Sequence, residues 1–177
     1  MNLRLKRTPG IYVVGFMASG KSTIARRLAH RIGWNFFDTD SEIERAEAAT
    51  ISELFEKRGE QEFRRIETEI LGQHVRWIER GRPAVLALGG GAFTQKANRE
   101  LLANNGISVW LDCPFETVKG RVAAQHGVRP LARDPQSFAA LYEARRELYQ
   151  LADVRVAIES DDPEAAIDAI LSGPIFQ

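Results

Sequence analysis

The stretch GFMASGKST (residues 15–23) lies between an apolar run, IYVVG, and a segment with helical spacing, IARRLAHRI. Its spacing, G-x4-G-K-S from Gly15 to Ser22, fits the phosphate-binding loop pattern. Glycines let the backbone curl around an anion, and the first N–H groups of the following helix favour negative charge. We expect Lys21 to reach phosphate oxygens and Ser22 to hold Mg2+. A plain turn between a strand and a helix would not require these residue types in this order.

The rest of the chain alternates between two kinds of pattern. Short apolar or β-branched runs, typical of buried strands, cover residues 11–16, 34–38, 84–89, 107–112 and 154–159. Apolar residues at helical spacing cover residues 21–32, 41–47, 51–57, 60–80, 96–104, 114–125, 136–151 and 163–172. This alternation predicts a three-layer α/β fold, in which helices cover both faces of a parallel sheet. Ligands of such sheets bind at the carboxyl ends of the strands.

The length and composition predict one domain over residues 1–177 and exclude several classes of partner. There are 24 basic and 24 acidic residues, largely interleaved, so no broad cationic field predicts binding to nucleic acid. No apolar stretch approaches the length of a membrane span. The single cysteine, Cys113, cannot form an internal disulfide, which favours the reducing cytoplasm.

Two acids, Asp38 and Asp40, follow the second predicted strand. If the chain stays extended there, both side chains point the same way, towards one site. One carboxylate would then order the water around Mg2+, and the other would accept a proton from an attacking hydroxyl or orient it. Alternatively, Asp40 or Ser41 caps the helix that follows.

Three further features allow both a functional and a structural interpretation. The glycines at 89–91 follow the third predicted strand, and they provide either a close approach to a ligand or a flexible strand exit. Arg64 and Glu67 are three residues apart and form either a solvated ion pair or part of a site. The stretch QHGVRPLARDPQ (residues 125–136) is either a surface loop or a mobile lid over the phosphates.

Read in order, GFMASGKST, FFDTDSEIE, ISELFEKRGEQEFRRIE, LALGGGA, VRPL and RRELYQLADVRV closely resemble the shikimate kinases, from about residue 11 to residue 163. The resemblance implies a P-loop kinase fold with a five-stranded parallel sheet and a lid over residues 125–136. It also implies transfer of the γ-phosphoryl group of ATP to the 3-hydroxyl of shikimate, with Mg2+ as cofactor, in the pathway to chorismate and the aromatic amino acids. We expect a monomer whose partners are ATP and shikimate.

The resemblance also assigns residues to three sites. The implied ATP-binding residues are Gly15, Ala18, Ser19, Gly20, Lys21, Ser22, Thr23, Arg121 and Arg129. The implied shikimate-binding residues are Asp40, Phe63, Arg64, Gly89, Gly90, Gly91 and Arg145, with Phe55 beside Phe63 and Glu67 orienting Arg64. Ser22 and Asp38 correspond to the metal site, and Asp40, Lys21 and Arg129 to the catalytic groups.

Two positions depart from the family pattern. Ala18 replaces a glycine that is common in the phosphate loop, which predicts that its backbone avoids conformations reserved for glycine. Glu147 stands where proline is common. Neither change removes a reacting group.

Two other functions remain open at this stage. One is a kinase of the same fold that acts on gluconate or a nucleoside monophosphate, and the other is a nucleotide-binding module without catalysis. Two arginines and an acid on the acceptor side favour a compact polyhydroxy carboxylate instead.

Overall fold

The computed structural model describes residues 10–125, 134–173 and 176. Within them, five parallel strands form one sheet in the order β2-β3-β1-β4-β5. The strands are β1 (Gly10–Val14), β2 (Asn35–Asp38), β3 (Ala84–Ala87), β4 (Ile107–Asp112) and β5 (Val154–Ala157). The predicted five-stranded parallel sheet is therefore confirmed.

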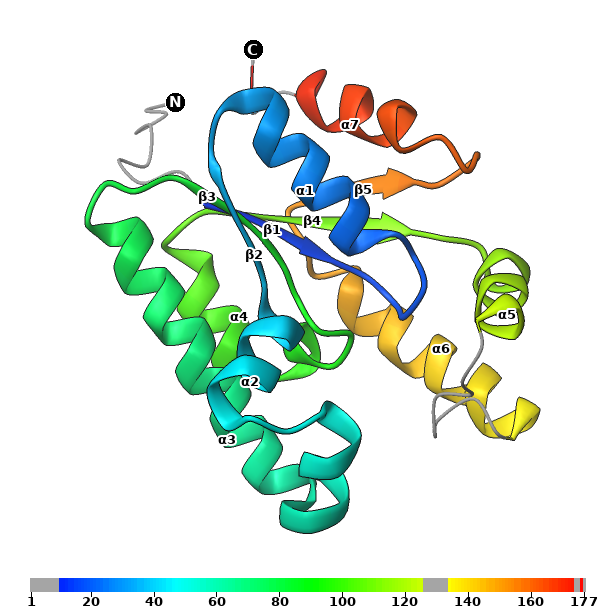
Figure 1. The fold of residues 1–177 in the computed structure, drawn as a ribbon. Coiled ribbons are helices and arrows are strands. Elements are labelled where there is room, and N and C mark those ends of the chain that lie inside the picture. The colour runs from blue at the N-terminus through cyan, green and yellow to red at the C-terminus, as the bar shows by residue number, and fades with distance from the viewer. Residues whose placement is uncertain (1–9, 126–133, 174–175, 177) are drawn as a thin grey trace.

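Helices cover both faces of this sheet. They are α1 (Lys21–Ile32), α2 (Thr39–Glu47), α3 (Ile51–Glu79), α4 (Lys96–Ala103), α5 (Phe115–Ala124), α6 (Pro135–Tyr149) and α7 (Pro163–Leu171), with a short 3-10 turn, η1 (Ala92–Thr94). Helices α1 and α7 lie on one face, whereas α3, α4 and α6 lie on the other (Figure 1). Parallel strands with a crossover between each pair produce this arrangement.

The central strands are hydrophobic on both sides because helices cover both faces. Every residue of β1 and β3 is buried, as is most of β4. A second, smaller core lies between α2 and α3 and contains Ile43, Leu54, Phe63, Ile66 and Ile70. This smaller core fixes α3 against α2, next to the carboxyl end of β2.

Two helix boundaries carry information about the site. The sequence predicted a break between residues 57 and 60, and the structure has a kink there, at Gly59, where φ is 80° and ψ is 169°. The first helix after β2 was predicted to begin at residue 41, but α2 begins at Thr39. Asp38 caps α2 by accepting a hydrogen bond from the Ser41 N–H at 3.2 Å, so neither Asp40 nor Ser41 is the cap.

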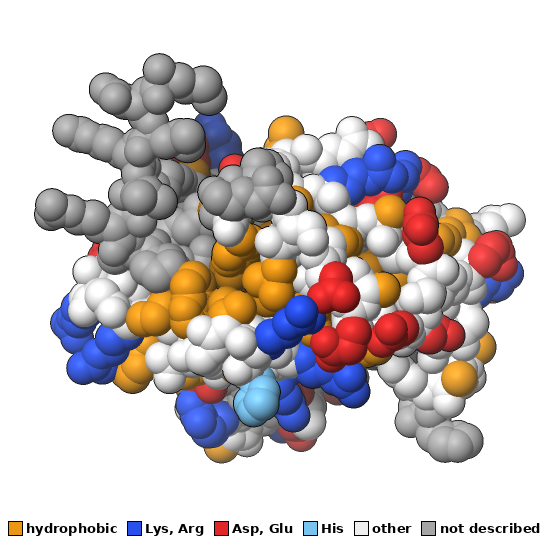
Figure 2. Space-filling model, turned by 90° about the horizontal axis from the view of Figure 1, so that it is seen from above, with side chains coloured by type: hydrophobic (Ala, Val, Ile, Leu, Met, Phe, Trp, Pro, Cys, Tyr) orange, Lys and Arg blue, Asp and Glu red, His pale blue; other side chains and the backbone are white. Residues whose placement is uncertain are grey.

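The surface over α1 and α7 mixes charges of both signs, as the composition predicted. In Figure 2 this face shows both basic and acidic side chains, beside a hydrophobic area. Two ion pairs between these helices, Arg27–Glu164 and Arg31–Asp168, contribute to the mixture. Across the described residues, no helix combines the length and apolar character needed to cross a bilayer.

Candidate active site

The stretch 15–23 connects β1 to α1 at the carboxyl end of the central strand. Gly20 caps α1 in the left-handed region, with φ 94°, and Gly15 has φ 152°, so both predicted glycines occupy backbone conformations that favour glycine. Gly15 is also crowded, because a Cβ there would lie 2.9 Å from the Leu111 carbonyl oxygen. The loop thus presents the first N–H groups of α1 to an anion. Lys21 folds back over the loop and donates a hydrogen bond to the Phe16 carbonyl at 2.8 Å.

Ala18 adopts a backbone conformation that is uncommon for alanine. Its φ is 59°, in the small left-handed region that L-residues still tolerate, and not in a region open to glycine alone. For an L-residue this conformation costs roughly 1–2 kcal/mol relative to right-handed backbone. The closed curve of the loop therefore overrides the local preference of alanine.

A cavity of about 450 Å3 opens beside the loop. Ala18, Ser19, Gly20 and Thr23 line one side, and the segment after β5 together with Arg121 lines the other. Of the predicted ATP-binding residues, these five surround one space of a size that suits a nucleotide.

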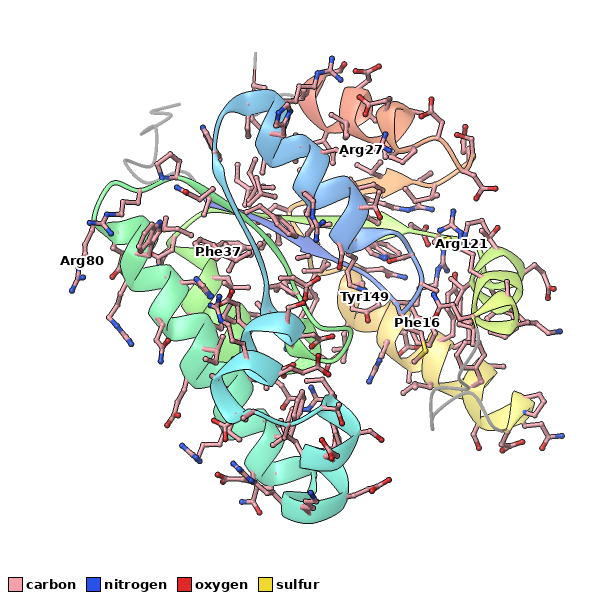
Figure 3. The ribbon with its side chains drawn as sticks, viewed as in Figure 1. Phe16, Arg27, Phe37, Arg80, Arg121 and Tyr149 are labelled. Carbon is pink, nitrogen blue, oxygen red and sulfur yellow. The ribbon has the colours of Figure 1, made fainter. Side chains whose placement is uncertain are left out.

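Arg121 spans this cavity from α5, and Figure 3 shows its side chain extending towards the loop. Its guanidinium donates to the Ala18 carbonyl at 3.0 Å and pairs with Asp161 at 2.6 Å. Asp161, Asp162 and Pro163 also line the cavity, although they were not among the predicted site residues. They follow the carboxyl end of β5, so the strand-end rule that located the other motifs could have found them.

Asp38 connects the phosphate loop to the start of α2. One carboxylate oxygen accepts the hydrogen bond from Ser41 N–H, and the other accepts one from the Ser22 hydroxyl. The pair supplies the oxygen donors that Mg2+ prefers, so these two residues fit the ion. Among the described residues no cluster of three or more His, Cys, Asp or Glu could hold a metal.

Asp40 does not point as the extended-chain argument assumed. Because Thr39 starts a helix, Asp38 and Asp40 lie on a turn and face different neighbours. Asp38 contacts the phosphate loop, whereas Asp40 faces the glycines after β3: a Cβ on Gly89 would lie 2.5 Å from an Asp40 carboxylate oxygen. The structure thereby separates two acids whose roles the spacing alone left open.

Each of the three glycines faces a different residue that was predicted to bind shikimate. A Cβ on Gly89 would meet Asp40, one on Gly90 would lie 3.1 Å from Arg145 Nη1, and one on Gly91 would lie 2.5 Å from Arg64 Nη1. None of the three glycines has a positive φ, so their backbone conformation does not require glycine. Their lack of a side chain leaves room for these three neighbouring groups, and close approach to a ligand stays a prediction.

Arg64 and Glu67 form a buried ion pair on α3, not a solvated one. Their nitrogen and oxygen are 2.8 Å apart, and the side chains are 17% and 1% exposed. Arg64 lies over the Phe63 ring, 5.3 Å from its centroid, and Phe63 packs on Phe55 at 4.5 Å. The Nε of Arg64 is buried without a hydrogen-bond partner in the structure. An unsatisfied donor of this kind is suited to a ligand acceptor.

The electrostatics of this cluster centre on Glu67. Burial raises the pKa of Glu67 to about 7, and the nearby Asp40 charge acts in the same direction. The charges of Arg64 and Arg145, together with the Arg64 hydrogen bond, oppose this increase in pKa. Glu67 therefore titrates near neutral pH inside the cluster.

Of the predicted site residues, only Arg129 cannot be placed, because it lies outside the described residues. The same holds for most of the predicted lid, since the structure describes residues 125 and 134–136 but not 126–133. The remaining residues gather at the carboxyl edge of the sheet, around the ends of β1, β2 and β3 and against α5 and α6.

Fold and site together define a class of protein. A phosphate loop between β1 and α1, a nucleotide-sized cavity and a separate cluster of acids and arginines are typical of a small P-loop kinase.

Comparisons with known proteins identify the member of this class. The shikimate kinase family model matches residues 17–173, and the chain belongs to that family. A shikimate kinase of Synechococcus sp. (strain CC9605) is 42% identical over 171 residues, covering 94% of this chain and 83% of that protein. A solved shikimate kinase of Acinetobacter baumannii, in complex with shikimate, is 38% identical with a TM-score of 0.83, covering 94% of this chain and 92% of that one. The enzyme from Aquifex aeolicus vf5 is 33% identical with a TM-score of 0.78, covering 92% and 93%.

Proposed function

We propose that this chain transfers the γ-phosphoryl group of ATP to the 3-hydroxyl of shikimate, giving shikimate 3-phosphate and ADP. The observation that carries the proposal is the convergence of Asp40, Arg64 and Arg145 on the three glycines after β3. A Cβ on Gly90 would also lie 3.8 Å from the Met17 N–H nitrogen of the phosphate loop. An acceptor held by this cluster would therefore lie next to the bound phosphates.

The nucleotide half of the reaction uses the loop and its cavity. The backbone of residues 15–20 and Lys21 would hold the phosphate oxygens, while Arg121 would contact the base. Ser22 and Asp38 would hold Mg2+, which when bound neutralises charge on the phosphates. Arg129 would add a positive charge on the group in transfer.

The acceptor half places one acid and two guanidinium groups around the substrate. Asp40 would accept the proton of the 3-hydroxyl of shikimate. The hydroxyl oxygen would form a bond to the γ-phosphorus of ATP, while the bond from that phosphorus to the β-phosphate oxygen breaks and ADP leaves. Arg64 and Arg145 would bind the carboxylate, because guanidinium forks match carboxylate geometry. Glu67 would hold Arg64 in place, and Phe55 and Phe63 would form the apolar wall.

Release of ADP in a coupled assay across several acceptors tests this function. We expect turnover with shikimate, and far less with quinate, gluconate, AMP or CMP. If gluconate or a nucleotide outperforms shikimate, the chain is another small-molecule kinase of the same fold. If no acceptor releases ADP although ATP binds, the chain is a nucleotide-binding module without catalysis.

We also propose that the enzyme acts as a monomer in the cytoplasm. The described surface over α1 and α7 mixes charges, and the buried Cys113 thiol is 3% exposed and suits a reducing compartment. Sedimentation at several protein concentrations tests the oligomeric state, and a dimer would contradict the proposed monomer.

A further inference from the structure

Tyr149, at the end of α6, belongs to the RRELY motif but has no role in the reaction as described above. Its side chain is 2% exposed, and its hydroxyl donates a hydrogen bond of 2.5 Å to the carbonyl oxygen of Gly90. The ring packs against Trp110 of β4 at 6.3 Å between centroids. In Figure 3 the residue lies beneath the sheet near Phe16, at the carboxyl end of the strands.

The same hydroxyl is close to Arg145. The two residues are four positions apart on α6, so they share one face of the helix. A Cβ on Gly90 would lie 3.1 Å from Arg145 Nη1 and 3.8 Å from the Tyr149 hydroxyl, which places both groups over one glycine. Burial raises the pKa of Tyr149 well above its usual range, and both the charge of Arg145 and a hydrogen bond donated by Arg145 oppose that increase.

The guanidinium of Arg145 has few other supports in the described part of the site. It lies over the Phe16 ring, 5.8 Å from the centroid. A ring face favours a cation but restricts its orientation weakly, whereas a hydrogen bond that the cation donates to a rigid, buried acceptor restricts it strongly. Tyr149 is such a group, because its own hydroxyl is fixed by the Gly90 carbonyl.

We propose that Tyr149 is a positioning residue: its hydroxyl accepts a hydrogen bond from Arg145, donates one to Gly90, and so holds the guanidinium against the glycines, facing the acceptor carboxylate. The inference rests on the proposed role of Arg145 in binding that carboxylate. Arg145 touches the substrate, and Tyr149 acts only through it. Without the hydroxyl, Arg145 must be ordered when the substrate binds, and the affinity falls.

Tyr142, two turns earlier on α6, provides a matched control. It is 7% exposed, and its hydroxyl donates to the Cys113 carbonyl at 2.7 Å. Both tyrosines therefore connect α6 to the end of a strand, Tyr142 at β4 and Tyr149 at β3. Of the two, only Tyr149 has its hydroxyl over Gly90 together with the guanidinium of Arg145.

The test compares Tyr149→Phe, Tyr142→Phe and wild type in the ADP-release assay with shikimate and with its neutral carboxamide. For Tyr149→Phe we expect KM for shikimate to rise about tenfold with kcat nearly unchanged, since one charge-assisted hydrogen bond is lost. KM for the carboxamide should stay within about twofold, because Arg145 has no anion to bind there. Tyr142→Phe should change neither KM, even where both variants lower the melting temperature.

A double-mutant cycle then measures Tyr149→Phe both in wild type and in the Arg145→Ala variant. In the alanine background the loss of the hydroxyl should leave KM for shikimate almost unchanged, because the group it positions is gone. Two results would show that Tyr149 supports the loop alone and would overturn the inference. One is an equal rise in KM for shikimate and for the carboxamide in Tyr149→Phe. The other is a rise in KM for shikimate that is as large in the Arg145→Ala background as in wild type. If Arg145→Ala itself leaves KM for shikimate unchanged, the proposed carboxylate site fails instead, and the two failures are distinguishable.

Discussion

At the scale of single residues, Asp38 and Asp40 illustrate how two identical side chains come to face different neighbours. Asp38 contacts Ser22 and the start of α2, and Asp40 faces Gly89. From these positions we expect the carboxylate beside the phosphate loop to act on the metal, and the one beside Gly89 to act on the substrate hydroxyl.

We therefore predict different defects when each of the two aspartates is replaced by asparagine. Asp40→Asn should reduce kcat by at least about a hundredfold, the usual contribution of a positioned general base, and leave the affinity for ATP close to wild type. Asp38→Asn should lose rate that excess Mg2+ partly restores. Titration of ATP binding and rate against Mg2+ measures both, and loss of ATP affinity only in the Asp40 variant would reverse the assignment.

Ala18 presents a residue-scale conflict between side chain and backbone. Replacement by glycine removes the left-handed strain at φ 59° but increases the freedom of the unfolded chain. The two effects leave a net gain of up to about 1 kcal/mol, or about 2–4 °C in melting temperature for a chain of this length.

Ala48 is the matched control for Ala18, because it has φ 49° at the exposed end of α2, away from the loop. Ala48→Gly should raise the melting temperature by a similar amount. A fall in melting temperature for Ala18→Gly alone would show that the loop carries no strain at this position.

At the scale of elements, the segment after β3 requires glycines because side chains from three other elements lie against it. Asp40 comes from α2, Arg64 from α3 and Arg145 from α6. Strand β3 lies between β1 and β2, so its carboxyl end is where these helices meet.

We predict that Gly91→Ala displaces Arg64, since the added Cβ would lie 2.5 Å from Nη1. The guanidinium can swing aside, so the protein should fold, but KM for shikimate should rise about tenfold or more. Gly72→Ala on α3 is the control: its Cβ would lie 3.5 Å from Arg76, an ordinary contact. That variant should keep the same KM and gain about 0.5–1 kcal/mol of stability from helix propensity. An unchanged KM for Gly91→Ala would contradict the close-approach explanation.

At the scale of the whole molecule, the buried Glu67 links the site to the stability of the fold. Its pKa is raised from 4.5 to about 7, so the folded state binds a proton that the unfolded state releases between these values. The contribution of Glu67 to the free energy of unfolding is therefore largest at low pH and falls as pH rises from about 4.5 to about 7.

Glu67→Gln should be free of this pH dependence. Relative to wild type, the variant should gain roughly 2–3 kcal/mol in the free energy of unfolding between pH 4.5 and 7.5, and no more above that range. Urea unfolding at several pH values measures the difference. A constant difference across this range would mean that Glu67 stays ionised throughout.

Much of the fold could be read from local patterns. The G-x4-G-K-S spacing and the alternation of apolar runs with helical spacing are local features, and they predicted the parallel sheet and the loop between β1 and α1. The predicted start of α2 was two residues too late, because the Asp38 side chain also caps the N-terminus of the helix. The left-handed backbone of Ala18 could not be predicted locally, because loop closure outweighs the preference of one residue.

The sequence by itself determined the order of elements and the chemical groups at the strand ends, since hydrophobic periodicity and glycine, acid and arginine spacing act over a few residues. Only the tertiary structure decided which groups meet: Asp40 with Gly89, Arg145 with Gly90, and Tyr149 with Gly90. Some of these partners are more than fifty residues apart along the chain. Their contacts depend on strand order and on the direction in which each buried helix face points, and those are set by packing of the whole core.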